Sequence, residues 1–368
     1  MVVEFFRGYS TAKVQSDNVS YAYSNAYDEQ AKRNRLLCYG VVMFFCACVA
    51  VKIIYEYTHV ETPKERSFRY ALEIAYRGQV VLETFKSNIL NETWEVTDRG
   101  WVTHEDELRV YRNVFTIGEN RSWLTTAKLV TPSEITDYNK VTADWPVDTR
   151  ALATNYKRML AMAPFFTETI PFDESATGNI LIIGLRGGGL SNFLHGERQN
   201  LDITVAEKDP VVKEIAQKWY GLKENKRYRV VLNEGVTVLR DRVQQGKNFD
   251  VILLDSCYFG YEHAICCPTQ PYLDEANIRL MKDALSQKGV LATNMYALRD
   301  HDESFERVIK AYRDVFENCL VLDVMLEANK ILVCYKRMIE NEDKEKEKID
   351  KAIENIKLQF ALDFWDKY

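Results

Sequence analysis

The stretch ILIIGLRGGGL, Ile180 to Leu190, runs from an apolar, strand-like segment directly into a cluster of glycines. A glycine turn at the end of a strand lets the backbone approach a ligand closely. Downstream, apolar strand-like segments alternate with helix-like ones. The expected strands are 203–207, 228–235, 249–255, 289–296, 319–325 and 330–336, and the expected helices are 209–221, 273–285 and 303–316. The sequence therefore predicts an α/β fold with a doubly wound, mostly parallel, seven-stranded sheet.

Upstream of this α/β domain, which we place at 146–340, the pattern changes. Residues 60–145 are interpreted as a linker and a small β element, because short apolar alternations such as VVLETF, TWEVTD and RVYRNVF follow one another there. Residues 148–166 have apolar side chains at helical spacing and predict a helix. Residues 341–368 interleave Lys and Glu around a narrow isoleucine stripe. They predict a charged amphipathic helix that lies on the domain or binds a partner helix.

One segment, residues 36–55, is apolar enough to cross a membrane. It carries LLCYGVVMFFCACVAV without a charge, and its apolar character continues beyond Lys52. About 20 such residues span a bilayer as a helix, with the lysine reaching to the interface. We expect a single-pass transmembrane helix after a polar N-terminal tail, residues 1–35; a cleaved signal and a buried core helix are the alternatives. The flanking basic cluster favours a cytoplasmic N-terminus: Lys32, Arg33 and Arg35.

Net charge and cysteine content limit the partners and metal sites to be expected. The formal charge of −6 and the pI of about 5.6 argue against a nucleic-acid partner, which would normally meet a basic surface. No second CxxC motif or histidine cluster is present, so we expect no metal site. Asn91 and Asn120 begin triplets of the N-glycosylation type. The cysteines beyond the apolar segment are odd in number and are interpreted as structural thiols: Cys257, Cys266, Cys267, Cys319 and Cys334.

Acidic residues end three successive strands of the predicted sheet. Glu207 ends the second strand, Glu234 and Gly235 follow the third, and Asp255 ends the fourth. Ligands of doubly wound sheets bind at these carboxyl ends, so the acids and the glycine turn are expected to share one crevice. A purely steric turn and solvated loop acids are the plainer alternative. A buried Asp255, however, would need a partner.

The glycine turn is not a phosphate-binding loop of either common type. No Gly-Lys-Ser/Thr follows it, and Arg186 occupies the second required glycine of the GxGxxG fingerprint. An array of acids suits a ligand with ribose hydroxyls, an adenine amino group and a positive sulfonium better than it suits a pyrophosphate. The sequence therefore predicts S-adenosylmethionine, or its decarboxylated form, as the cofactor.

Five segments together, IGLRGGGLSNFLH, AEKDPVVKEIAQKWYGL, VVLNEGVTVL, FDVILLDS and CCPTQPYL, resemble the methyltransferases with a spermidine-synthase-type fold, which is Rossmann-like. Within that family the likeness is greatest to the C-terminal domain of the methyltransferase-like protein 13 group, which methylates a lysine and the N-terminus of elongation factor 1-alpha. The likeness covers residues 145 to 340 and leaves the apolar segment without a counterpart. It implies a class I methyltransferase that uses S-adenosyl-L-methionine.

The resemblance also implies roles for single residues. Glu207 would hold the ribose hydroxyls, Glu234 the adenine amino group, and Asp255 would lie beside the sulfonium. The turn glycines would line the methionine and ribose part of the cofactor: Gly184, Gly187 and Gly188. We count Arg186 and Gly235 with these cofactor-binding residues. Arg186 stands where the family usually has glycine, and it is accommodated if its side chain points out.

We therefore expect a membrane-anchored methyltransferase acting on a protein amine, a lysine or an N-terminus, as a monomer or homodimer. Asp255 would accept or orient the proton of the amine, and Tyr258 or Tyr261 would shape the acceptor pocket; His263 is an alternative base. Aminopropyl transfer to a polyamine is a rival, although the D-x-x-D pair of polyamine synthases is replaced by Asp255-Ser-Cys-Tyr. A catalytically inactive scaffold of the same fold is a rival of a different class.

Overall fold

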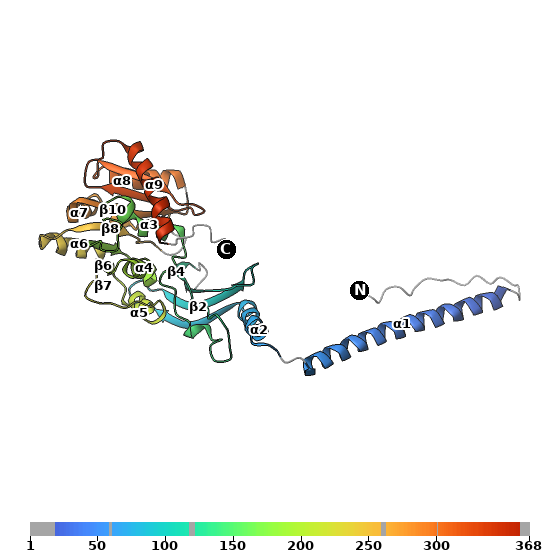
Figure 1. The fold of residues 1–368 in the computed structure, drawn as a ribbon. Helices are drawn as coiled ribbons and strands as arrows, with labels where there is room; N and C mark the ends of the chain where they lie inside the picture. The colour runs from blue at the N-terminus through green and yellow to red at the C-terminus, as the bar shows by residue number, and fades with distance from the viewer. Residues whose placement is uncertain (1–18, 59–60, 118–121, 259–262, 300, 361–368) are drawn as a thin grey trace. The chain divides into compact units, whose positions relative to one another are not determined.

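The computed structural model describes residues 19–58, 61–117, 122–258, 263–299 and 301–360 (Figure 1). The chain divides into two units, residues 1–65 and 66–368. In the first, helix α1 (Val19–Thr58) is a single 40-residue helix. Helical structure thus begins well before residue 36, within the predicted polar tail. Its stretch Gln30–Ile54 is long and apolar enough to cross a membrane, a property that signal sequences and buried core helices share.

The second unit begins with a small antiparallel sheet, as the alternating segments predict. Its strands pair in the order β1-β2-β3-β4: β1 (Gln79–Lys86), β2 (Thr93–Val102), β3 (Leu108–Thr116) and β4 (Trp123–Lys128). Helix α2 (Pro63–Tyr76) packs Tyr70 and Ile74 against apolar side chains of this sheet. Arg112 on β3 is buried beside Asp98 on β2, with Nε and Nη2 at 2.8 and 2.9 Å from the two carboxylate oxygens.

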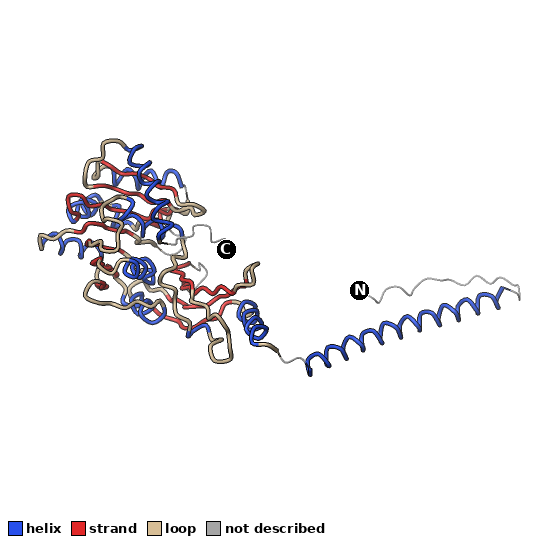
Figure 2. The backbone as a smooth tube through the Cα atoms, in the orientation of Figure 1, coloured by secondary structure: helices blue, strands red, loops and turns tan. Residues whose placement is uncertain are grey.

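The main sheet is mixed and has eight strands (Figure 2). The first five strands of its path, β7, β6, β5, β8 and β10, are parallel, whereas β12 is antiparallel to both β10 and β11. The short strand β9 (Ile265–Cys267) pairs with β10 and makes the sheet larger than the seven strands expected. The other bounds are β5 (Gly178–Ile183), β6 (Leu201–Glu207), β7 (Tyr228–Leu232), β8 (Phe249–Leu254), β10 (Leu285–Ala297), β11 (Asn318–Asp323) and β12 (Lys330–Tyr335).

Helices cover both faces of this sheet. Alternate strand residues enter two separate cores, as the pleat requires: Ile180 and Ile182 enter one, Leu181 and Ile183 the other. The first core contains side chains of α3 (Asn155–Phe166), α4 (Gly189–Glu197), α5 (Pro210–Trp219) and α9 (Glu342–Gln359). The second contains those of α6 (Gly235–Gln244), α7 (Glu275–Ala284) and α8 (His301–Arg313). The α/β expectation is confirmed, with 3-10 turns at Thr142–Asp144, Arg186–Gly188 and Gln270–Leu273.

Helix α3 is shorter than the helix predicted over 148–166. Thr154 is extended, with φ −127° and ψ 144°, so the helix begins at Asn155. The backbone N–H groups of Asn155 and Tyr156 donate to the carboxylate of Glu327, at 2.6 and 2.9 Å. A glutamate from a distant turn therefore caps the helix, and the residues around the helix start do not predict this cap.

The interpretation of the cysteines as thiols is wrong for four of them. Cys319 and Cys334 are cross-strand partners on β11 and β12 and form a disulfide. Cys257 and Cys267 form a second one, because the chain after β8 turns back and pairs Tyr258 N–H with the Cys266 carbonyl. Cys266 remains a buried thiol. Both pairings depend on strand register, which the spacing of cysteines along the chain does not reveal.

Candidate functional site

The glycine turn follows β5 and is held against the end of β8. Gly184 has φ +98°, and a Cβ there would lie 2.5 Å from the Asp255 carbonyl oxygen, so only glycine fits. The turn then passes through positive φ at three consecutive residues before α4 begins: Arg186, Gly187 and Gly188. The Leu185 N–H donates to Oε2 of Glu207 at 3.0 Å, which ties the turn to the end of β6.

Glu207 is buried at the end of β6 and oriented by backbone groups. The Asp209 N–H donates to its Oε1 at 2.9 Å, in addition to the Leu185 N–H on Oε2. Burial raises the pKa of Glu207, while these two hydrogen bonds act in the opposite direction. The carboxylate is thus fixed in one orientation beneath the glycine turn, and each oxygen keeps further lone pairs for a hydroxyl donor.

The end of β7 forms the other side of the same crevice. The Glu234 side chain is exposed, and its Oε1 lies 3.8 Å from Lys208 Nζ. Gly235 starts α6 where a Cβ would lie 2.5 Å from the Tyr272 hydroxyl and 2.7 Å from Ile183. This close packing has no room for a side chain at residue 235.

Asp255 lies at the centre of the site and has several partners. It is 2% exposed, and Asn294 Nδ2 donates to its Oδ1 at 3.0 Å. The Tyr156 hydroxyl donates to Oδ2 at 3.5 Å, and Arg186 Nε lies 3.8 Å from the same oxygen. Burial raises the pKa of Asp255, although Arg186 and Lys157 favour its ionised form.

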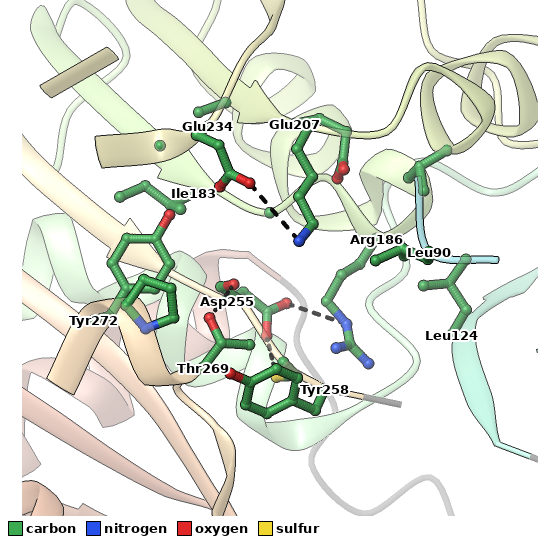
Figure 3. Close-up of a pocket in the computed structure, with 18 of the residues that line it drawn as sticks. Leu90, Leu124, Ile183, Arg186, Glu207, Glu234, Asp255, Tyr258, Thr269 and Tyr272 are labelled. Carbon is green, nitrogen blue, oxygen red and sulfur yellow. Dashed lines mark hydrogen bonds and ion pairs between the residues drawn. The ribbon is translucent and has the colours of Figure 1, made fainter. Parts of the chain in front are cut away.

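The Arg186 side chain points into the site, not out of it. Figure 3 shows its guanidinium directed toward Asp255, and the side chain is only 16% exposed. Burial disfavours the charged form, but the attraction of Tyr156 and Asp255 outweighs it and raises the pKa of Arg186. The expectation of an outward side chain is wrong, because the side chain extends toward Asp255, which follows the end of β8.

Lys157 is a site residue that sequence reasoning missed. It lies on α3, is 4% exposed, and donates from Nζ to Thr125 Oγ1 at 3.3 Å. Burial lowers its pKa to about 8, and Arg186 adds to this effect, whereas Asp255 opposes it. The signal available in the sequence was a lysine inside a helix that is otherwise largely apolar.

Two cavities meet at these residues. The first has a volume of about 280 Å³ and is lined by the acids of all three strand ends, together with Gly184 and Gly235. The second has a volume of about 680 Å³ and is lined by Lys157 and by aromatic side chains, among them Phe115, Trp123, Tyr156 and Tyr296. Four residues line both cavities: Leu124, Arg186, Cys257 and Tyr258.

The remaining predicted residues are placed as follows. Gly187 and Gly188 belong to the turn, and a Cβ on Gly187 would lie 2.7 Å from Thr125 of β4. Tyr258 lies in the wall between the cavities, and His263 is exposed and stacks on its ring with centroids 3.8 Å apart. Tyr261 lies outside the described residues, as does Asn120. Within the described part of the chain, no cluster of three or more His, Cys, Asp or Glu side chains is placed to hold a metal.

The α/β domain is similar to known proteins. Residues 153–329 match the spermine/spermidine synthase domain. The chain is 28% identical over 157 residues to an eEF1A lysine and N-terminal methyltransferase homolog of Drosophila melanogaster, covering 42% of this chain and 23% of that protein. It is 31% identical over 142 residues to a polyamine aminopropyltransferase of Vibrio vulnificus, covering 37% and 43%. A solved structure, a probable spermidine synthase from Corynebacterium glutamicum, aligns with a TM-score of 0.52 at 14% identity over 74% of this chain and 86% of that one.

Residues 153–329 therefore resemble the spermine/spermidine synthase domain, and the chain has the fold of a probable spermidine synthase. Proteins named eEF1A lysine and N-terminal methyltransferases are among its homologues. The match covers less than a quarter of the Drosophila protein and less than half of the Vibrio one.

Proposed function

We propose that this spermidine-synthase-like chain is a membrane-anchored, S-adenosylmethionine-dependent methyltransferase whose acceptor is an amine of a protein, a lysine or an N-terminus. The observation that carries the proposal is the convergence of Glu207, Glu234 and Asp255 with the glycine turn on one cavity. That cavity shares a wall with a larger, aromatic one. A donor pocket beside an acceptor pocket is what direct group transfer requires.

The residues of the first cavity fit the donor. Glu207, fixed by two backbone N–H groups, accepts hydrogen bonds from the ribose hydroxyls. Exposed Glu234 would accept a hydrogen bond from the adenine amino group. Asp255 would be the buried anion beside the positive sulfonium. These three roles use one acid from each strand end, as the order of the parallel strands dictates.

Methyl transfer is a direct displacement. When bound, the donor supplies a methyl carbon on a positive sulfur; the acceptor nitrogen forms a bond to this carbon while the carbon–sulfur bond breaks and its electron pair stays on sulfur. The amine proton must leave, and Asp255 accepts or orients it, which a raised pKa assists. Tyr258 and the aromatic side chains of the second cavity exclude water from the reacting atoms.

Aminopropyl transfer to a polyamine is the second candidate, and the Vibrio relative favours it. Two observations weigh against it. The D-x-x-D pair is absent, and the charged residues that line the second cavity are two cations, Lys157 and Arg186, with one acid, Glu327, a set that does not favour a polycationic acceptor. An inactive scaffold of the same fold makes one distinct prediction, the absence of donor binding.

Donor binding is the first test. We expect isothermal titration of the full chain in detergent micelles to show one saturable site for S-adenosylmethionine. Glu207→Ala should weaken binding by about tenfold to a hundredfold, the equivalent of one charged hydrogen bond worth about 1.5–3 kcal/mol. The exposed Glu317, outside both cavities, provides the control Glu317→Ala, which should bind normally. A wild-type chain without saturable binding would support the scaffold instead.

The side of the membrane is a second test. Disulfides such as Cys257–Cys267 and Cys319–Cys334 form in oxidising compartments, and the basic cluster before the apolar segment favours a cytoplasmic N-terminus. We therefore propose that the methyltransferase domain lies on the non-cytoplasmic side. A C-terminal tag in intact microsomes should resist added protease until detergent is present. Digestion of the tag without detergent would place the domain in the cytosol.

The exposed Asn91 gives an independent readout of the same orientation. On the lumenal side its triplet can carry a glycan. A mobility shift that is removed by a glycosidase and absent from Asn91→Gln would agree with protease protection.

A further inference from the structure

Arg186 occupies an unusual place in the glycine turn. Its backbone has φ +42°, a conformation that residues other than glycine rarely adopt. Its side chain lies in the wall common to both cavities, with Nε 3.8 Å from Asp255 Oδ2 (Figure 3). An arginine at a position that favours glycine, with its guanidinium held inside the site, suggests a role in recognising a ligand.

Cations and carboxylates meet at this wall. The cations are Arg186 and Lys157, and the carboxylates that act on them are Asp255, Glu207 and Glu327. The other charged pair of the first cavity, Lys208 and Glu234, is balanced within itself. In addition, α4 begins immediately after Arg186-Gly187-Gly188, so the positive end of its dipole points toward the same turn. One further negative charge would be well placed here.

The two candidate donors differ in that one charge. S-adenosylmethionine carries a sulfonium, an ammonium and a carboxylate, and its net charge is about +1 at neutral pH, because the carboxylate is ionised and the amine is protonated. The decarboxylated donor lacks the carboxylate and therefore carries one more unit of net positive charge. A guanidinium binds a carboxylate through two parallel hydrogen bonds and repels a second cation.

We infer that Arg186 binds the α-carboxylate of S-adenosylmethionine and thereby selects this donor over its decarboxylated form. Arg186 is then a specificity-determining residue: it commits the chain to methyl transfer and against aminopropyl transfer, using the same fold and the same three acids. The inference rests on the proposed function, since it presupposes that the first cavity holds such a donor.

The test compares two donors on three proteins. Binding of S-adenosylmethionine and of its decarboxylated form is measured by isothermal titration of the full chain in detergent micelles. We expect the wild type to bind S-adenosylmethionine about tenfold to a hundredfold more tightly. Arg186→Gly should lose this preference, because it weakens binding of S-adenosylmethionine and no longer repels the decarboxylated form. Arg186→Lys, which keeps a point charge without the fork, should retain part of it.

A matched control comes from the same cavity. Lys208→Ala removes a cation that pairs with Glu234 at the other end of the crevice, so it should change the affinity for both donors by the same factor. Thermal melting of each variant separates a loss of preference from a loss of fold.

Each outcome has a defined meaning. A wild type that binds both donors equally overturns the role of Arg186 but leaves the donor site standing. An Arg186→Gly variant that melts normally and keeps the wild-type preference, or weakens both donors equally, also overturns it. Binding of neither donor by the wild type removes the proposed function itself. If Arg186→Gly does not fold, the wild-type ratio and Arg186→Lys still decide.

Discussion

Replacing Asp255 by asparagine is expected to slow methyl transfer by about 10²-fold to 10⁴-fold, the range typical of removing a group that accepts a proton in the transition state. Asp255 is buried among Asn294, Tyr156 and Arg186, so the asparagine can keep much of the geometry while it loses the charge. The rate is measured under saturating donor with a protein acceptor. Donor affinity is measured separately, because in the proposed site the lost anion would also face the sulfonium.

The same variant affects Lys157. Asp255 raises the pKa of Lys157 against the larger, opposing effect of burial, so its removal should move that pKa further below about 8. Asp314→Asn, an exposed aspartate paired with Lys310, is the control and should leave rate and affinity unchanged. A rate of Asp255→Asn within threefold of wild type would show that Asp255 neither accepts the proton nor orients it.

Arg112→Met is expected to lower the free energy of unfolding by about 3–5 kcal/mol, the cost of breaking a buried ion pair on one side. Arg112 and Asp98 are 3% and 2% exposed, and the guanidinium also donates from Nη2 to the Thr142 carbonyl at 2.9 Å. Its removal leaves Asp98 as a buried charge in the antiparallel sheet. Chemical denaturation of the full chain, followed by tryptophan fluorescence, measures the loss.

Two control variants separate the effect of burial from the loss of an ion pair as such. Arg229 pairs with Asp202 across two strands of the main sheet, but both side chains are about one third exposed, so Arg229→Met should cost less than about 1 kcal/mol. Replacing both partners, as Asp98→Leu with Arg112→Met, should recover much of the loss. Equal losses for Arg112→Met and Arg229→Met would contradict the buried-pair account.

The sequence predicts the parts of the fold that follow from local pattern. Apolar runs locate the parallel strands, and the residue that ends each run locates the acids, because the carboxyl ends of parallel strands share one edge. Glu207, Glu234 and Asp255 therefore come together as the strand order dictates. The roles of these residues toward a cofactor stay predictions until binding is measured.

What the sequence does not reveal depends on contacts between distant segments. The start of α3 is fixed by Glu327, and the two disulfides are fixed by strand register. The Arg186 side chain extends toward Asp255 at the end of another strand, and a single sequence does not determine that contact. Lys157 enters the site because α3 packs beside β4, where Thr125 receives its hydrogen bond. Each of these features is set by tertiary contacts.

The two cavities are bordered by different exposed residues. Under the proposed function, this affects how many methyl groups an acceptor receives before it is released. The first cavity is bordered by Glu234, whose side chain is 57% exposed, and the second by Trp123, which is 44% exposed. Under the proposed function, spent donor would leave at the Glu234 side while a protein acceptor stayed bound at the Trp123 side. Such an arrangement would favour processive modification, in which one amine is methylated repeatedly before the acceptor is released.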